Sequence, residues 1–254
     1  MAARKLWLLD CGRLVVDRSI LTYRRGMGES QEIPVISAVV ETDDGYLLFD
    51  TGLNPDALED ASLVLGEKAH VLSSFTKSDD VRSRLASVGV AVDDVRWVVN
   101  SHLHWDHTGG NRYFAEAEFV LQKEEWRFAH QADQFVESVY LQQQYDLKRQ
   151  YTLLNGSKEI TEGVAVINTR GHTPGHQSLV VDLPELGYVI LSGDALYCPE
   201  NLDELLPPGN AWDMREAFRS MTELLFWKNY LKAKVIIGHD PGLWTEFSPQ
   251  KAYQ

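Results

Sequence analysis

Four short apolar runs in this chain lead directly into histidine or aspartate, and this recurring pattern restricts the possible folds more than any other feature. The predicted strands and the residues after them are 95–100 with His102, His104, Asp106 and His107; 163–168 with His172; 188–191 with Asp194; and 234–237 with His239. Open α/β sheets carry functional side chains in the loops at strand ends, so we expect these residues to converge. One such turn would be commonplace, but four in one chain indicate a shared site.

The remaining segments predict a mixed α/β architecture in which helices cover the sheets. Further strands are expected at 34–41 and 46–49, around a turn at 43–45, and at 118–121 and 178–182. Helices are expected at 78–88, with Ser78 as N-cap and Gly89 at the end, and at 123–130, 134–145 and 214–227. No repeat or linker divides the chain, so residues 1–254 are predicted to form a single domain.

The charge of the chain favours a small-molecule substrate. Lys and Arg number 24 and Asp and Glu number 37, which gives a formal net charge of −13. So acidic a surface repels phosphate backbones and anionic membranes, and therefore disfavours nucleic-acid and membrane partners. No stretch reaches membrane-spanning length, and the apolar run 6–9 is too short for a signal-peptide core. With Cys11 and Cys198 expected as isolated thiols, the predicted location is the cytoplasm.

The densest part of the pattern is His102-x-His104-x-Asp106-His107. In an extended stretch His102 and His104 lie on one face and can hold one ion, whereas Asp106 and His107 follow as the chain turns and can face a second ion. Imidazole and carboxylate suit zinc and other borderline divalent metals, and the lack of clustered thiolates argues against a closed structural zinc site. A solvated polar loop, or an acid–base cluster without metal, is the alternative reading of this motif alone.

Together the motifs resemble the metallo-β-lactamase superfamily and, more narrowly, its N-acyl-homoserine lactone hydrolases, the quorum-quenching lactonases. The segments that carry the resemblance are S-H-L-H-W-D-H at 101–107, G-H-T-P-G-H-Q-S-L at 171–179, Asp194-Ala195-x-Tyr197, G-H-D at 238–240, F-D-T-G at 49–52 and the N-terminal segment 6–17 with Gly12-Arg13. The resemblance spans nearly the whole chain. It implies an αβ/βα sandwich, with two mixed sheets flanked by helices and the metals at one edge.

The resemblance also implies a ligand set. His102, His104 and His172 would hold one metal, Asp106, His107 and His239 the other, and Asp194 would bridge both. The implied cofactor is two Zn²⁺ per chain, with iron, manganese or cobalt as alternatives. Asp50 would orient a ligand, or would simply cap a turn. His176 is expected to be a satisfied loop residue, and His70 and His130 are expected at the surface.

The implied reaction opens a lactone ring by attack of a metal-bound hydroxide. Tyr197 would donate a hydrogen bond to the developing oxyanion, and Asp106 would handle the proton of the leaving oxygen. Trp105 is the expected wall of the groove for the acyl chain, with the loops around Met27 and Phe75 as weaker candidates. As alternatives, Trp105 and Tyr197 would be aromatic residues of the core.

Several other functions fit the same motifs. The fold also suits hydrolysis of another lactone, a thioester, a phosphotriester or, with less support, a β-lactam. An iron-dependent redox enzyme and a metal-retaining binding module are alternatives from other classes. An open, carboxylate-rich site, however, is not typical of a structural metal site. Both a monomer and a homodimer are compatible with the sequence.

Overall fold

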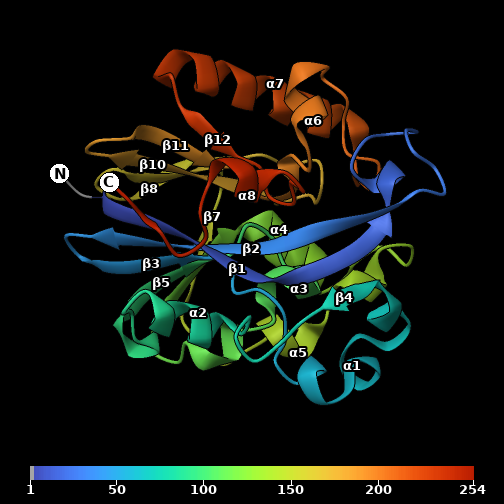
Figure 1. Cartoon of the computed structure of the whole chain (residues 1–254), viewed down its shortest axis with the longest axis horizontal. Helices are drawn as coiled ribbons and strands as arrows, with labels where there is room; N and C mark the ends of the chain where they lie inside the picture. The colour runs from blue at the N-terminus through green and yellow to red at the C-terminus, as the bar shows by residue number, and fades with distance from the viewer. Residues whose placement is uncertain (1–2) are drawn as a thin grey trace.

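The computed structural model describes residues 3–254, in which two mixed sheets lie face to face with helices on their outer sides (Figure 1). The first sheet has the strand order β13-β1-β2-β3-β5-β6-β7, with β4 beside β1. Its strands are β1 (Ala3–Asp17), β2 (Ser30–Thr42), β3 (Gly45–Phe49), β4 (Leu72–Ser74), β5 (Val95–Val99), β6 (Glu118–Gln122), β7 (Tyr151–Leu154) and β13 (Ala252–Tyr253). The second sheet has the order β12-β11-β10-β9-β8. Its strands are β8 (Lys158–Thr161), β9 (Val164–Asn168), β10 (Gln177–Leu183), β11 (Gly187–Leu191) and β12 (Lys234–Ile236).

Helices flank the two sheets. Among the described residues they are α1 (Ala57–Leu65), α2 (Val81–Ser87), α3 (Trp105–Thr108), α4 (Lys123–Ala129), α5 (Gln142–Tyr145), α6 (Pro199–Asp203), α7 (Met214–Leu231) and α8 (Leu243–Glu246). One of them, α8, packs Leu243 into the layer between the sheets. Figure 1 shows α7 above the second sheet and α2 below the first. Asp213 caps α7 by accepting hydrogen bonds from the backbone of Arg215 and Glu216, which satisfies amides that a helix start leaves unpaired.

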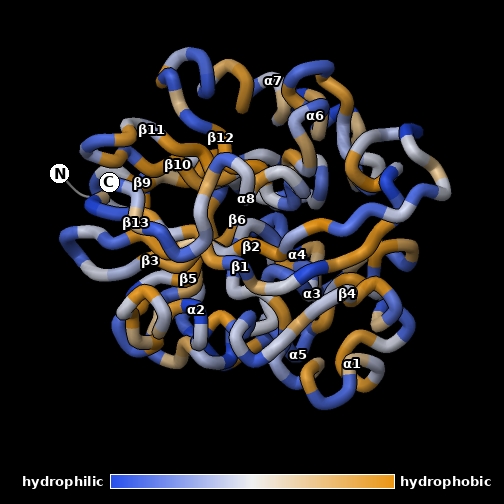
Figure 2. Tube along the Cα trace, in the orientation of Figure 1, coloured by the Kyte–Doolittle hydropathy of each residue, from blue (hydrophilic) through white to orange (hydrophobic). Residues whose placement is uncertain are grey.

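Several strands are apolar along most of their length because successive side chains point into two different buried layers. In β2, Val40 points into the layer between the sheets, whereas Val39 points outward toward the helices. In β10, Leu179 likewise points into the shared layer and Val180 toward α7. Successive side chains of a strand face opposite sides, so a sheet buried on both faces needs apolar residues at every position. Figure 2 shows the resulting hydrophobic band along the central strands.

Strand directions bring the predicted strand ends to one edge of the sandwich. In the first sheet β3, β5 and β6 are parallel neighbours. In the second, β12 runs parallel to β11, and β9 and β11 are both antiparallel to β10, so these three share a direction. The loops after β3, β5, β9, β11 and β12 therefore lie where the sequence pattern places its histidines and aspartates. The two-sheet fold and the convergence of the strand ends are confirmed.

Two predicted helices were wrong in detail. The helix expected from Ser78 begins at Val81, because Asp80 is the N-cap and accepts a hydrogen bond from the backbone of Arg82. The helix expected at 134–145 is broken into a short 3₁₀ turn at Glu137–Val139 and α5. The glutamines at 142–144 do not continue the apolar face that a single helix over 134–145 would need in order to pack against the sheet.

The long strand β1 was not predicted as a strand. Its pairing with β2 is irregular between Asp10 and Arg13, where a bulge interrupts the alternation of side chains. Within residues 3–254, none of the helices combines the length and the apolar character needed to cross a bilayer.

Candidate metal centre

Seven side chains gather where the two sheets meet. The loop after β5 and the first turn of α3 supply His102, His104, Asp106 and His107 from the first sheet, and the loops after β9, β11 and β12 supply His172, Asp194 and His239 from the second. All seven candidates from the sequence pattern are thus brought together. Apart from the half-buried His104, all are buried.

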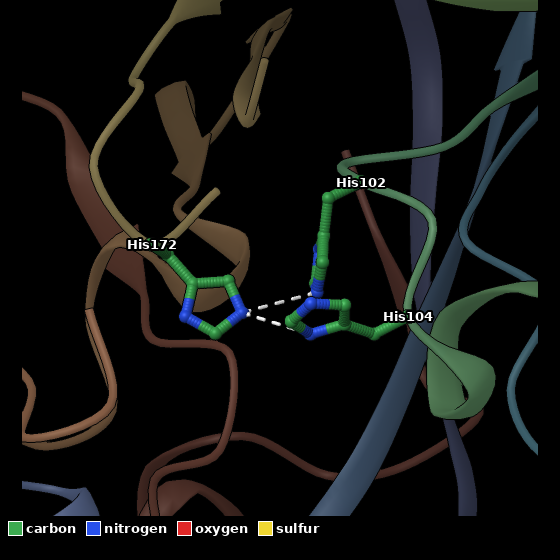
Figure 3. Close-up of side chains that lie close together, drawn as sticks. All are labelled: His102, His104 and His172. Carbon is green, nitrogen blue, oxygen red and sulfur yellow. Dashed lines mark hydrogen bonds between the residues drawn. The ribbon is translucent and has the colours of Figure 1, made fainter. Parts of the chain in front are cut away.

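One group consists of three histidines whose ring nitrogens face one another. The Nε2 atom of His172 lies 3.2 Å from Nε2 of His102 and 3.1 Å from Nδ1 of His104 (Figure 3). His172 comes from the second sheet and the other two from the first. Three converging imidazole nitrogens are the arrangement that one divalent ion requires.

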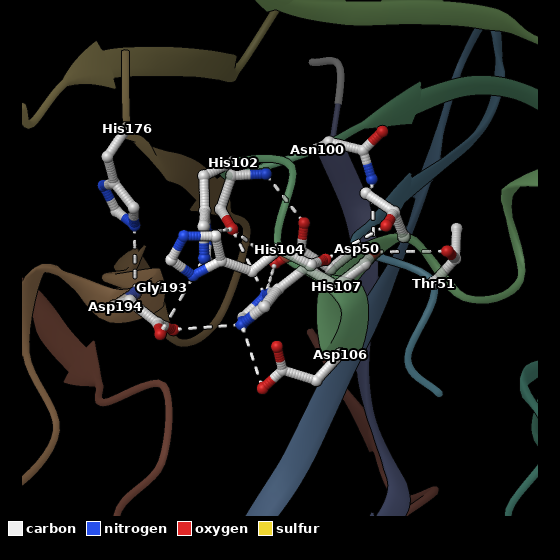
Figure 4. Close-up of polar contacts among 12 residues, drawn as sticks. Asp50, Thr51, Asn100, His102, His104, Asp106, His107, His176, Gly193 and Asp194 are labelled. Carbon is white, nitrogen blue, oxygen red and sulfur yellow. Dashed lines mark hydrogen bonds and ion pairs between the residues drawn. The ribbon is translucent and has the colours of Figure 1, made fainter. Parts of the chain in front are cut away.

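The second group contains Asp106, His107 and His239. Figure 4 shows Asp194 and Asp106 on either side of the His107 ring. Oδ1 of Asp194 is 3.2 Å from Nε2 of His107 and 3.2 Å from Nε2 of His239. Its other oxygen, Oδ2, is 3.4 Å from Nε2 of His172. The carboxylate therefore offers one oxygen to each group, which is the geometry of a bridge. Asp106 Oδ2 lies 3.7 Å from Nε2 of His107.

Hydrogen bonds on the far side of the rings leave lone pairs facing the centre. His239 donates from Nδ1 to the carbonyl oxygen of Pro34 at 2.7 Å, and His107 donates from Nδ1 to Asp50 at 2.8 Å. A neutral imidazole that donates from Nδ1 carries its lone pair on Nε2. Among the described residues, Nε2 of His107 and Oδ1 of Asp194 are buried without a hydrogen-bond partner. Buried polar atoms are rarely left unpaired, so this donor set fits a divalent metal.

Burial keeps the three-histidine group neutral. Loss of hydration lowers the pKa of His102 and of His104 well below the ordinary value, and that of His172 to about 4. Burial also opposes protonation of His107, but the carboxylates of Asp194, Asp106 and Asp50 outweigh it and raise that pKa. Neutral imidazole is the form that binds a metal ion.

Asp50 holds the loop that carries the first histidines. Its carboxylate accepts hydrogen bonds from the backbone N–H and the hydroxyl of Ser101, both at 2.7 Å, and from His107. The Ser101 hydroxyl in turn lies 2.9 Å from Nδ1 of His102. Asp50 is buried with a positive φ of 58°, a costly conformation for a residue other than glycine. These contacts match the orienting role expected for Asp50.

His176 is more than a satisfied loop residue. It is fully buried, its Nε2 accepts a hydrogen bond of 2.9 Å from the backbone N–H of Asp194, and its Nδ1 lies 2.9 Å from the hydroxyl of Thr169. His176 thus fixes the backbone from which Asp194 projects. His70 and His130 are exposed, as expected.

Tyr197 lies against the bridging carboxylate. Its hydroxyl donates to Oδ2 of Asp194 and accepts a hydrogen bond of 3.0 Å from the side-chain amide of Asn210. Its ring stacks on His239, with 5.1 Å between ring centroids. Burial, and then the charge of Asp194, raise the pKa of Tyr197 well above its ordinary value, so the hydroxyl keeps the proton that it donates.

A cavity of about 280 Å³ opens onto the candidate metal centre, and four of the seven residues line it: His104, Asp106, Asp194 and His239. The apolar residues that line it are Leu14, Val16, Ile20, Ile33, Val71, Trp105, Phe135, Val136 and Val139. Its polar residues are Lys68, His104, Asp106, Ser138, Asp194, Tyr197, Asn210 and His239. Trp105 both lines the cavity and packs in the core, so the two expectations for it are compatible. Met27 and Phe75 themselves are not among the residues that line this cavity, and the loops around them stay a prediction for the groove wall.

Sequence reasoning missed three residues of this neighbourhood. Ser101 sits inside the histidine motif, but serine in a loop gives no signal of its own. Asn210 contacts Tyr197 from a segment without regular structure, and Glu125 is a buried carboxylate on α4 that reads as a surface residue in K-E-E-W. Only contacts made in three dimensions distinguish these side chains from ordinary polar residues.

Comparison with known proteins gives one family. The model of the metallo-β-lactamase superfamily matches residues 32–237. An N-acyl homoserine lactonase from Bacillus sp is 31% identical over 242 residues, covering 94% of each chain. The N-acyl homoserine lactonase AttM of Agrobacterium fabrum (strain C58 / ATCC 33970) is 30% identical over 256 residues, covering 96% of this chain and 95% of the relative.

Solved structures agree with the sequence relatives. A variant of AiiA from B. thuringiensis with N-decanoyl-L-homoserine bound at its active site has a TM-score of 0.90 and 29% identity, with full coverage of both chains. An N-acyl homoserine lactone hydrolase with the product N-hexanoyl-L-homoserine bound at its catalytic metal centre also has a TM-score of 0.90, at 28% identity.

Proposed function

The chain belongs to the metallo-β-lactamase superfamily and, within it, to the family of N-acyl homoserine lactonases, and from this premise we propose that it hydrolyses the lactone ring of N-acyl homoserine lactones and thereby acts in quorum quenching. The observation that carries the proposal is that the two oxygens of Asp194 face two different groups of candidate metal ligands beside a largely apolar cavity. The polar lactone ring would suit the polar residues of that cavity, and the acyl chain would suit its apolar walls.

We propose two zinc ions as the cofactor. His102, His104 and His172 would hold one, Asp106, His107 and His239 would hold the other, and Asp194 would contact both. Bound at these residues, two such ions would supply Lewis-acid chemistry, which lowers the pKa of water and polarises a carbonyl group. Nitrogen and carboxylate donors without thiolates suit zinc, and also admit iron, manganese or cobalt.

Hydrolysis adds water across the ester bond of the ring. The oxygen of water joins the carbonyl carbon, the bond from that carbon to the ring oxygen breaks, and the ring oxygen leaves with a proton. Asp106 lines the cavity among the candidate ligands, so it is placed to pass that proton. The Tyr197 hydroxyl, which donates to Asp194 in this structure, would turn its hydrogen bond to the carbonyl oxygen as negative charge develops there.

The apolar walls would hold the acyl chain, with Trp105 beside the reacting groups. The net charge of −13 supports a small-molecule substrate over nucleic acid. We further propose that residues 1–254 act as one domain in the cytoplasm, as a monomer or a homodimer. The free, buried thiols of Cys11 and Cys198 agree with a reducing compartment.

The test compares substrates on the zinc-loaded enzyme. We expect kcat/KM for an N-acyl homoserine lactone to exceed that for a β-lactam, a thioester and a phosphotriester by orders of magnitude. Faster turnover of a thioester or phosphotriester than of any lactone would overturn the substrate assignment. One tightly bound iron without a second metal would instead support the redox alternative.

A further inference from the structure

Glu125, on α4, is a fully buried carboxylate that is not among the seven candidate ligands. None of the ion pairs within residues 3–254 includes it. A carboxylate without a cation is costly to bury unless hydrogen bonds satisfy it. Burial accordingly raises the pKa of Glu125, while its hydrogen-bond donors act in the opposite direction.

The donors to Glu125 come from two loops of the candidate metal centre. Its Oε1 accepts a hydrogen bond of 3.0 Å from the backbone N–H of Leu103, the residue between His102 and His104. Its Oε2 accepts from the hydroxyl of Thr173 at 2.6 Å and from the backbone N–H of Gly175 at 3.1 Å, just after His172. Through these hydrogen bonds, Glu125 links the loop of the first sheet that carries His102 and His104 to the loop of the second sheet that carries His172.

Two further contacts show that both loops pack closely around Glu125. A Cβ atom at Gly175 would lie only 2.2 Å from the backbone nitrogen of Glu125, so the loop after His172 rests directly on α4. The hydroxyl of Tyr140 also donates to Oε1 of Glu125, at 3.3 Å, and the Tyr140 ring packs edge-on against the ring of His104 at 4.9 Å.

We propose that Glu125 is a positioning residue that sets the spacing of His102 and His104 relative to His172, and thereby determines how tightly the three-histidine group holds its metal ion. The proposal rests on the proposed function, because it requires that these three histidines share one ion. It does not make Glu125 a ligand. Groups that orient metal ligands typically change metal affinity by roughly 10- to 100-fold when removed.

The test is zinc binding by Glu125→Gln, measured by competition with a chromophoric chelator. Glutamine keeps the size of the side chain, but its NH₂ group cannot accept a hydrogen bond, so one loop loses its acceptor. We expect one of the two zinc equivalents to weaken about tenfold or more and the other to keep its affinity. In the cobalt-substituted protein, the visible absorption of one ion should change. Glu118→Gln, on β6, is the matched control and should leave both equivalents unchanged.

Thr173→Val provides a second, milder variant, because it removes one of the hydrogen bonds to Glu125. We expect the same zinc equivalent to weaken by a smaller factor. Wild-type affinity for both ions in Glu125→Gln, with only a lower melting temperature, would overturn the role of Glu125 alone. If Glu125→Gln fails to fold, unchanged affinity in Thr173→Val would overturn it. A wild-type chain that takes up only one zinc ion would overturn the two-metal site but not this inference, and a chain that takes up none would overturn both.

Discussion

At the scale of single residues, Asp194 has the most demanding position. Each of its oxygens faces a different group of candidate metal ligands, and an amide in its place would carry no charge to offset the two proposed dications. We expect Asp194→Asn to lower both zinc content and kcat/KM by at least about 100-fold, beyond the loss typical of residues that only orient ligands. Elemental analysis and steady-state kinetics measure both effects. Asp182→Asn, an exposed carboxylate on β10, is the control. Near-normal activity in Asp194→Asn would show that Asp194 is not the bridge.

Tyr197 tests catalysis separately from metal binding. Its hydroxyl contacts Asp194 and Asn210, while its ring packs on His239. Tyr197→Phe keeps the ring and removes the hydrogen bond that strengthens as the oxyanion develops. We expect kcat to fall about tenfold, or ~1–2 kcal/mol, because a metal shares the stabilisation. Zinc content should not change.

The kinetics of Tyr197→Phe distinguish three roles for the hydroxyl. A rise in KM alone would mean that it binds ground state and transition state equally. Unchanged kinetics with lower stability would make Tyr197 a packing residue. Tyr188→Phe, near the start of β11 and away from the strand end that carries Asp194, is the control.

At the scale of elements, the loops after β11 and β12 are packed too closely to admit a side chain. A Cβ atom at Gly238 would lie 2.4 Å from the carbonyl oxygen of Gly193, which is backbone and cannot move aside cheaply. We expect Gly238→Ala to destabilise the fold by ~1–3 kcal/mol and to weaken zinc binding, because Asp194 and His239 follow these glycines. Urea denaturation and chelator competition measure these effects. Gly242→Ala should have little effect, since its nearest neighbour is the flexible end of Asp240.

The elements also show how far the sequence could predict this molecule. Strands such as β5 and β11 were predictable because they are mostly apolar, interrupted in β5 by the exposed Arg96, and the candidate ligands follow within a few residues of each strand end. β1 was missed because its bulge between Asp10 and Arg13 breaks the alternation on which strand prediction depends. The partners of Glu125 could not be predicted, since Leu103 and Gly175 contribute only backbone N–H groups, which no sequence pattern marks.

At the scale of the whole molecule, each metal-binding group draws donors from both sheets. His102 and His104 come from the first sheet and His172 from the second, so a bound ion stabilises only the chain in which the sheets are docked. At free zinc 100 times the dissociation constant this linkage contributes about 2.7 kcal/mol, or roughly 5–10 °C in Tm for a chain of this size. That figure is for one ion, and because a chelator removes both proposed ions, we expect it to lower Tm by at least that amount in scanning calorimetry. The same chelator should leave the Tm of Asp194→Asn almost unchanged, and an unchanged Tm in the wild type would contradict the linkage.

The sharing of donors between the sheets also bears on how long the folded molecule lasts. Neither sheet alone presents a complete donor set, so an ion can be captured only after the sheets have docked and contributes little to the rate of folding. Before the sheets can separate, however, a bound ion must lose the ligands that come from one of the sheets. This step adds to the barrier for unfolding. A bound ion would therefore slow unfolding, and the lifetime of the folded chain in a metal-poor medium would depend on how slowly the ion dissociates.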